Sequence, residues 1–285
     1  MQGYQSVFLF RSRSKSLATL PTQVIGICRF SYPAKGGFKI NHASSLERAN
    51  YLYSSRRLDE RFAMFESLTI PSIRAQTDKD FTFLIVIGKD LPERRLLQLK
   101  KLTEDIPQVV IQSHAPGQHR KVMQAAINSI RNPGKFSIQF RNDDDDAINC
   151  EFVRKTRETT LKAAELIASN RHVAIDFVNG YTVRTSARGI QASPAQSLFL
   201  GVAFAVVFHP NVQLSIMNFA HHDIWRHMAT ITMSDANMWV RGINGHNDSG
   251  SSMDKRLPVL TGELERTFGR EFGISSARVR EIYRN

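Results

Sequence analysis

Cysteine is scarce in this chain of 285 residues. Only Cys28 and Cys150 occur, too few to cross-link a secreted domain of this size, so we expect a reducing, cytoplasmic environment. Long apolar runs are also missing, because the longest, residues 197–208, is shorter than the roughly 20 residues that a membrane-spanning helix needs. Near the N-terminus an apolar patch precedes basic residues, the reverse of a secretory signal. We therefore expect no membrane span, and a flexible basic leader over residues 1–20.

Several enzyme fingerprints are absent as well. The chain contains no G-x-x-x-x-G-K-[ST] phosphate loop, no G-x-G-x-x-G dinucleotide turn, no H-E-x-x-H and no G-x-S-x-G. These absences argue against kinases, dehydrogenases, zincins and serine hydrolases. They leave open the enzymes that hold a divalent metal ion on carboxylates.

Acidic residues are too few to balance the basic ones. The chain has 26 acidic and 38 basic residues and a formal net charge of +12. Such an excess attracts nucleic acid, phosphorylated small molecules or an anionic lipid surface. Residues 271–285 imitate the turn and second helix of a helix-turn-helix module, but no separable basic domain with a packed preceding helix accompanies them. We therefore expect no nucleic-acid partner.

What the chain does have is an alternation of apolar runs and helical patterns, which predicts an α/β domain with parallel strands and crossover helices. The sequence is 42% apolar, enough for a sizeable core. A helix carrying Leu58, Phe62, Phe65 and Leu68 is expected to end or kink at Pro71. The expected strands of this first half are residues 23–30, 81–87, 109–112 and 136–140, and further helices are expected over residues 92–102, 122–130 and 152–167.

Beyond residue 171 the pattern predicts antiparallel strands added to the sheet. An Asn179-Gly180 pair between two apolar runs predicts a hairpin turn. Four more segments are expected: an apolar run over residues 198–208, a helix over 219–228, a strand and loop over 237–246, and an amphipathic helix over 264–272 that docks on the core.

Four consecutive aspartates, Asp143 to Asp146, follow the strand at 136–140 directly. Like charges so close together raise each other's pKa, and a bound cation relieves the repulsion. Carboxylate oxygens at the carboxyl end of a strand suit Mg²⁺ or Mn²⁺, which keep open positions for substrate phosphates. A solvated acidic turn or a calcium site is the alternative. The favoured cofactor is therefore Mn²⁺ or Mg²⁺.

The segment FSIQFRNDDDDAI resembles the strand and D-x-D motif of GT-A glycosyltransferases. More narrowly, RFSYPAKGGFK, RLDERFAMFESLTIPSIRAQTDKDF and HRKVM followed by FRNDDDDA resemble the bacterial putative rhamnosyltransferase family, well over residues 28–157 and weakly beyond. The resemblance implies a GT-A (Rossmann-like) mixed sheet over residues 21–285, with a nucleotide-sugar half (21–170) and an acceptor half with C-terminal helices (171–285). It also implies that Asp143 and Asp145, followed by Asp146, hold the metal and that Asp144 contacts the donor, within one position of register.

Basic residues near the strand ends would share the binding of a nucleotide diphosphate. A guanidinium and a helix N-terminus both suit an anion. The alternatives are a surface ion pair for Arg141, ordinary helix-start polarity for the helix at 122–130, and a core position for Phe30, whose ring would otherwise stack on a base. The donor-binding candidates are Arg29, Phe30, Ser31, His119, Arg120 and Arg141.

Late residues would complete the site. In the family that the chain resembles, a histidine near the end of the domain often ligates the metal, and His246 is our first candidate, with His221 and His222 next. An inverting reaction would need a carboxylate base, either Asp223 or Asp248. A retaining one would not.

We therefore predict a metal-dependent glycosyltransferase of the cytoplasm, peripheral at the inner membrane through its basic surface. It would move a sugar, rhamnose by resemblance, from a nucleotide-diphosphate donor to a saccharide or lipid-linked acceptor in surface-polysaccharide synthesis. The alternatives are a Mg²⁺-dependent phosphohydrolase or nucleotidyltransferase, since carboxylates on a strand end serve those reactions too.

Overall fold

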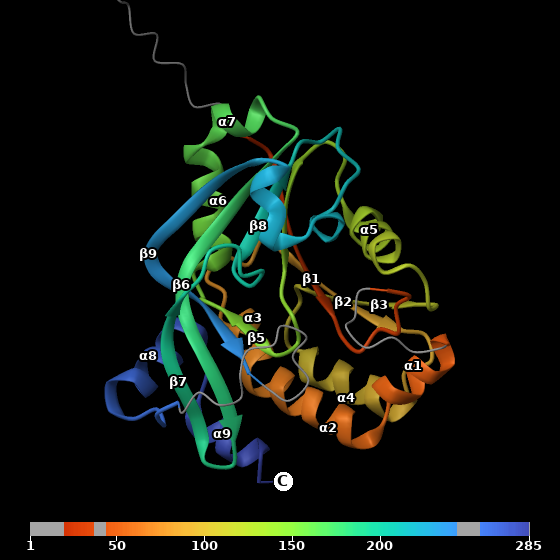
Figure 1. The fold of residues 1–285 in the computed structure, drawn as a ribbon, viewed down its shortest axis with the longest axis vertical. Helices are drawn as coiled ribbons and strands as arrows, with labels where there is room; N and C mark the ends of the chain where they lie inside the picture. Colours follow the sequence, from red (N-terminus) through yellow and green to blue (C-terminus); the bar gives the residue numbers. More distant parts are fainter. Residues whose placement is uncertain (1–19, 37–43, 244–256, 285) are drawn as a thin grey trace, which may run out of the picture.

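The computed structural model of the protein describes residues 20–36, 44–243 and 257–284, and in them one nine-stranded sheet forms the centre of the fold (Figure 1). The strand order is β3-β2-β1-β4-β8-β6-β9-β5, and β7 also pairs with β6. The strands are β1 (Thr22–Arg29), β2 (Thr82–Gly88), β3 (Val109–His114), β4 (Phe136–Arg141), β5 (Asp146–Ile148), β6 (His172–Ser186), β7 (Gly189–Gln196), β8 (Phe204–Phe208) and β9 (Ala229–Gly242).

The first half of the chain forms the parallel half of this sheet. β3, β2, β1 and β4 lie side by side and every neighbouring pair among them is parallel. β1 and β2 are almost continuously apolar and buried, as strands covered on both faces are. This arrangement confirms the prediction of an α/β fold with crossover helices.

Helices cover both faces of the sheet. On one face α2, α4 and α6 pack against residues such as Val24, Phe83 and Phe140. On the other face α5 packs against Ile25, Ile27 and their neighbours. The helical segments are α1 (Ser45–Leu52), α2 (Ser55–Met64), the π-helical turn η1 (Phe65–Thr69), α3 (Ile70–Arg74), α4 (Glu93–Thr103), α5 (His119–Ile130), α6 (Phe152–Lys162), α7 (Ala164–Ala168), the 3₁₀ turns η2 (Ile216–Asn218) and η3 (His221–Arg226), α8 (Gly262–Phe272) and α9 (Ser276–Ile282). Among the residues that the structure describes, no helix is long and apolar enough to cross a membrane.

The second half of the chain adds antiparallel strands, as predicted. β8 pairs antiparallel with both β4 and β6, and β5 pairs antiparallel with β9. The amphipathic helix α8 buries Phe268 and Phe272 against the β6–β7 hairpin, which confirms its predicted docking. Figure 1 shows α8 and α9 beside this hairpin, at the end away from α6 and α7.

The predicted turn at Asn179-Gly180 is wrong. β6 runs unbroken through both residues, and its hairpin with β7 turns after Ser186, where Gly189 has a positive φ of 105°. Gly180 serves a close approach instead, because a Cβ there would lie 2.2 Å from the Trp239 carbonyl oxygen. The register between β6 and β9 also shifts at this point. A local sequence pattern cannot distinguish this use of Asn-Gly from a turn.

Three helical predictions need correction. The segment at 219–228 contains only the short 3₁₀ turn η3, because the chain enters β9 at Ala229. The segment at 152–167 is interrupted at Ala163 between α6 and α7. Pro71 does not end its helix, because the chain passes through it from η1 into α3 in helical conformation. The predicted alternative, a distortion, is present as the π-helical turn η1 directly before it.

Candidate functional site

Two arginines end neighbouring parallel strands at the same edge of the sheet. Arg29 is the last residue of β1 and Arg141 the last of β4, whose backbone is in register with Ile27. His119 begins α5, and the pKa of this imidazole responds to the charges of both arginines and of Asp143. The structure thus brings the predicted Arg29, Arg141, His119 and Asp143 together at the carboxyl edge, where open α/β sheets bind ligands.

The four aspartates diverge, and two of them bind an arginine that the sequence analysis missed. Arg61, on α2, donates from Nε to Asp144 Oδ2 at 2.8 Å and pairs through Nη1 with Asp145 Oδ2 at 3.4 Å. The three side chains are only 11%, 3% and 10% exposed, respectively. A buried guanidinium therefore offsets the repulsion within the aspartate run that the sequence analysis assigned to a cation.

Asp146 accepts hydrogen bonds that link it to neighbouring segments. Its Oδ1 accepts a hydrogen bond from the Gly242 N–H at 3.2 Å, and its carbonyl accepts from the Thr69 hydroxyl at 2.7 Å. Burial and the neighbouring charges of Asp145 and Asp143 raise the pKa of Asp146 well above its usual value. These contacts fasten the aspartate run to β9 and to η1.

Asp143 has a more accessible carboxylate than Asp144 and Asp145 have. Its side chain is 49% exposed, and its Oδ2 lies 3.8 Å from Arg141 Nη2. Burial raises the pKa of Asp143, but the charges of Arg141, Arg29 and Arg61 outweigh that effect and hold the pKa below its usual value. Asp143 is therefore a stable carboxylate in a cationic surrounding.

Two neutral histidines flank this carboxylate. Burial, followed by the charges of Arg29 and Arg141, lowers the pKa of His119 to about 3. Burial and Arg141 lower the pKa of His221 to about 4. At neutral pH both imidazoles are uncharged, so they add hydrogen-bonding atoms and no charge to the site.

This burial predicts an acid-dependent loss of stability. Because the folded pKa of His119 is depressed from 6.5 to about 3, the unfolded chain binds more protons below pH 6.5. The free energy of unfolding is therefore unaffected by this histidine above pH 6.5 and falls as the pH drops below it. We expect a steeper fall for the wild type than for His119→Gln between about pH 7 and pH 5, measured by urea unfolding at each pH. Equal slopes for the two proteins would contradict the burial of a neutral His119.

The fit of a divalent ion follows from these contacts. Among the described residues no three His, Cys, Asp or Glu side chains converge as a metal-binding group. Asp145 and Asp146 would have to leave their present partners to bind one. Asp143 alone suits a Mg²⁺ or Mn²⁺ ion that is held by one carboxylate and substrate phosphates, an arrangement common for Mg²⁺. His246, the predicted further ligand, lies outside the described residues.

The remaining predicted residues lie in different settings. Phe30 is fully buried and packs on Phe62 and Phe65, so its ring is in the core and does not face a base. Ser31 is also buried, with a left-handed φ of 47°, and Arg120 is exposed on the first turn of α5. Asp223 lies in η3, two residues after His221; its side chain is 40% exposed and is 3.7 Å from Arg226 Nε. The alternative base, Asp248, lies outside the described residues.

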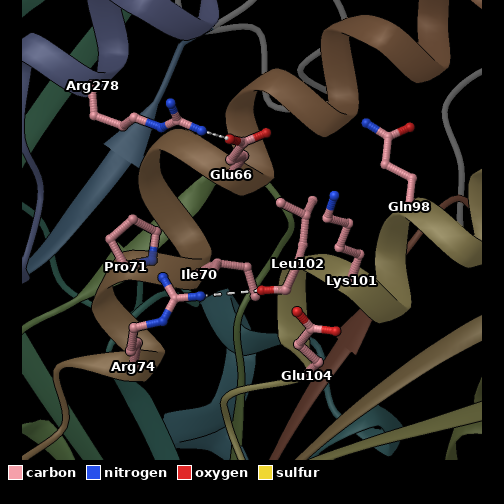
Figure 2. Close-up of a pocket in the computed structure, with 9 residues that line it drawn as sticks. All are labelled: Glu66, Ile70, Pro71, Arg74, Gln98, Lys101, Leu102, Glu104 and Arg278. Carbon is pink, nitrogen blue, oxygen red and sulfur yellow. Dashed lines mark hydrogen bonds and ion pairs between the residues drawn. The ribbon is translucent and has the colours of Figure 1, made fainter.

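A cavity of about 430 Å³ lies between η1, α3, α4 and α9 and contains none of the predicted site residues (Figure 2). Glu66, Ile70 and Lys101 line it, and Figure 2 shows two lining arginines already bonded, Arg278 to Glu66 and Arg74 to the Leu102 carbonyl. Arg29, Arg141, His119 and Asp143 at the edge of the sheet form a separate group, the strand-edge cluster. The cavity does not reach it, because η1 directs Thr69 toward Asp143 and Asp146 while Glu66 faces the cavity.

The chain is similar in sequence to one protein family and in structure to several solved structures. A family model described as "Putative rhamnosyl transferase" matches residues 23–256. No curated protein matches the chain. Among solved structures, residues 1–349 of S. aureus TarS in complex with UDP-GlcNAc are similar, at 11% identity over 81% of this chain and 61% of that chain, with a TM-score of 0.44. The same fragment in complex with UDP covers 78% of this chain and 60% of that one, with a TM-score of 0.42. This chain therefore spans about three fifths of those structures.

Proposed function

Because the chain belongs to the family described as putative rhamnosyl transferases, we propose that it transfers a sugar, with rhamnose the first candidate, from a nucleoside-diphosphate donor. The acceptor would be a saccharide or a lipid-linked saccharide in surface-polysaccharide synthesis. The observation that carries the proposal is the strand-edge cluster, in which Arg29 and Arg141 end neighbouring parallel strands beside Asp143. Guanidinium groups match phosphate oxygens in charge and hydrogen-bond geometry, so a diphosphate suits this cluster.

The arginines would act on the leaving group. Glycosyl transfer expels a nucleoside diphosphate, and the negative charge that develops on its phosphate must be stabilised. Arg29 and Arg141 are the last residues of buried strands, so the sheet fixes the positions of both at their backbones. Neutral His119 would add a hydrogen bond to the same anion without a competing positive charge.

A divalent ion, when bound, would supply Lewis-acid stabilisation of the same phosphates. Asp143 would hold it, with phosphate oxygens and water as the other ligands. Asp144 and Asp145 would contribute indirectly, because their ion pair with Arg61 fixes the backbone from which Asp143 projects. His246 as a further ligand belongs to the same proposal.

Asp223 is our candidate base for an inverting reaction. Its carboxylate, 40% exposed, lies in the same 3₁₀ turn as the neutral His221, which flanks Asp143. A carboxylate in this place would accept the proton of the acceptor hydroxyl as the glycosidic bond forms. We place Asp248 second, for the same reaction.

The positive net charge also suggests where in the cell the protein works. A net charge of +12 attracts anionic lipid head groups, and the effect falls off within about a Debye length, about 8 Å at physiological salt. We propose that the protein works in the cytoplasm and touches the inner membrane peripherally, where a lipid-linked acceptor would be available.

Donor-dependent stabilisation tests the proposal. We expect one class in a panel of uridine, thymidine and guanosine diphosphate sugars to raise the melting temperature of the full chain in the presence of Mn²⁺, since ligands that bind the folded state stabilise it. The same donor should be hydrolysed slowly to its nucleoside diphosphate. Arg141→Leu should abolish both effects, whereas Arg154→Leu, which removes an exposed arginine on α6, should preserve them.

Other products would contradict the proposal. Release of inorganic phosphate from nucleotides would identify a phosphohydrolase. Formation of a nucleoside-diphosphate sugar from a nucleoside triphosphate and a sugar phosphate would identify a nucleotidyltransferase.

A further inference from the structure

The segment that joins β7 to β8, residues 197–203, has a strained backbone. Phe199, Gly201 and Ala203 all have left-handed φ angles, of 53°, 97° and 48°. For residues other than glycine this conformation costs roughly 1–2 kcal/mol each. Something in the surrounding structure must therefore hold the segment in this shape.

Asp176 provides that hold from inside the sheet. It lies fully buried on β6, between β8 and β9, and its Oδ2 accepts a hydrogen bond from the Phe199 N–H at 2.9 Å. Its Oδ1 has no hydrogen-bond partner among the described residues. Burial raises the pKa of Asp176 to about 6, a sign of how unfavourable a carboxylate is at this place. A buried acid that bonds the strained segment calls for a role beyond packing.

The strained segment in turn contacts the strand-edge cluster. The Phe199 carbonyl bonds His221 Nδ1, and because a carbonyl only accepts, Nδ1 carries the proton and Nε2 keeps its lone pair. Gly201 lies so close that a Cβ there would be 3.2 Å from both Arg141 Nη2 and His221 Cδ2. Asp176 thus reaches the residues beside Asp143 through one hydrogen bond and one short segment.

We propose, resting on the function proposed above, that Asp176 is a positioning residue of the transfer site. It fixes residues 197–203, whose Phe199 carbonyl holds His221 with Nε2 as a neutral hydrogen-bond acceptor beside Arg141. The substrate group that such an acceptor binds is a hydroxyl, which both the transferred sugar and a saccharide acceptor carry. Asp176 itself touches no substrate in this account.

Two substitutions at Asp176 separate positioning from charge. Asp176→Asn keeps an oxygen that accepts from the Phe199 N–H, so we expect kcat for donor turnover to stay within about threefold of the wild type. Asp176→Ala removes that oxygen, and we expect kcat to fall about 10- to 100-fold, as small displacements in a site do. Hydrogen exchange of the Phe199 amide should accelerate in the alanine variant and not in the asparagine variant.

Two further variants serve as controls. Thr160→Ala removes a buried hydroxyl that bonds the Thr156 carbonyl within α6, and it should lower stability without changing kcat. Gly201→Ala adds a methyl group against Arg141 and His221, and it should lower kcat with Asp176 intact. Gly201→Ala also keeps the proposal testable if the Asp176→Ala protein does not fold.

Several results would overturn the proposal. An Asp176→Ala protein with wild-type kcat and wild-type exchange at Phe199 would refute the role of Asp176 and leave the proposed function standing. So would an asparagine variant as impaired as the alanine variant, or a fully active Gly201→Ala. A wild-type protein that neither binds nor turns over any sugar nucleotide would refute the proposed function and this role together.

Discussion

Asp143→Asn should reduce the turnover of the sugar-nucleotide donor by about 100-fold or more, with the fold intact. The Asp143 side chain is half exposed, so the asparagine amide would occupy the same space without the charge. Loss of one electrostatic contact that acts on the transition state typically lowers kcat by about 10²- to 10³-fold. Release of the nucleoside diphosphate, measured with and without Mn²⁺, is the readout, and the metal dependence should weaken with it.

Asp235→Asn is the matched control for this prediction. Asp235 is about half exposed on β9, pairs with Lys155 and lies outside the strand-edge cluster. Its substitution should leave turnover unchanged. Full activity of the Asp143→Asn protein would show that the carboxylate plays no part in the reaction.

Arg61→Met should destabilise the protein by about 3–5 kcal/mol, because it removes the guanidinium that pairs with the buried carboxylates of Asp144 and Asp145. Methionine retains much of the apolar stem, so the loss reports mainly the missing ion pairs. Urea unfolding near neutral pH is the measurement. The triple variant that adds Asp144→Asn and Asp145→Asn should recover part of the loss.

The same helix supplies a control. Arg56 is 92% exposed on α2 and pairs with Glu60, so Arg56→Met should change the free energy of unfolding by no more than about 0.5 kcal/mol. If Arg61→Met proved as mild as Arg56→Met, the ion pair with Asp144 and Asp145 would not stabilise the aspartate run.

The parallel half of the fold was predictable because its physical signals are local. β1, β2 and β4 are short, mostly buried strands rich in apolar residues, and their helices repeat apolar residues at helical spacing. Parallel strands place their carboxyl ends at one edge, so the convergence of Arg29, Arg141 and Asp143 followed from the same pattern. The docking of α8 through Phe268 and Phe272 followed from an amphipathic stripe.

What the sequence analysis missed depends on contacts between distant segments. Gly180 was interpreted as a turn residue because nothing local reveals Trp239 packed against it. Arg61 meets Asp144 across 83 positions of sequence. One signal could have found it: Arg61 stands three residues after Leu58 and four before Phe65, on the buried face of its helix. A basic residue on an apolar face needs a buried acidic partner.

The different roles of the four aspartates could not be predicted from the sequence either. Four identical side chains follow one another, and only the surroundings assign them. Asp144 and Asp145 face Arg61, Asp146 faces the Gly242 N–H, and Asp143 faces solvent and Arg141. The role of Asp176 depends likewise on the left-handed residues of the 197–203 segment, which no sequence pattern marks.

The central claim is that the strand-edge cluster binds the diphosphate of a sugar nucleotide. A crystal structure of the full chain with a nucleoside diphosphate and Mn²⁺ tests it most directly. We expect phosphate oxygens within about 3 Å of the guanidinium groups of Arg29 and Arg141, with the metal ion on Asp143. A diphosphate bound elsewhere, for instance in the cavity lined by Glu66 and Lys101, with the cluster untouched, would contradict the account.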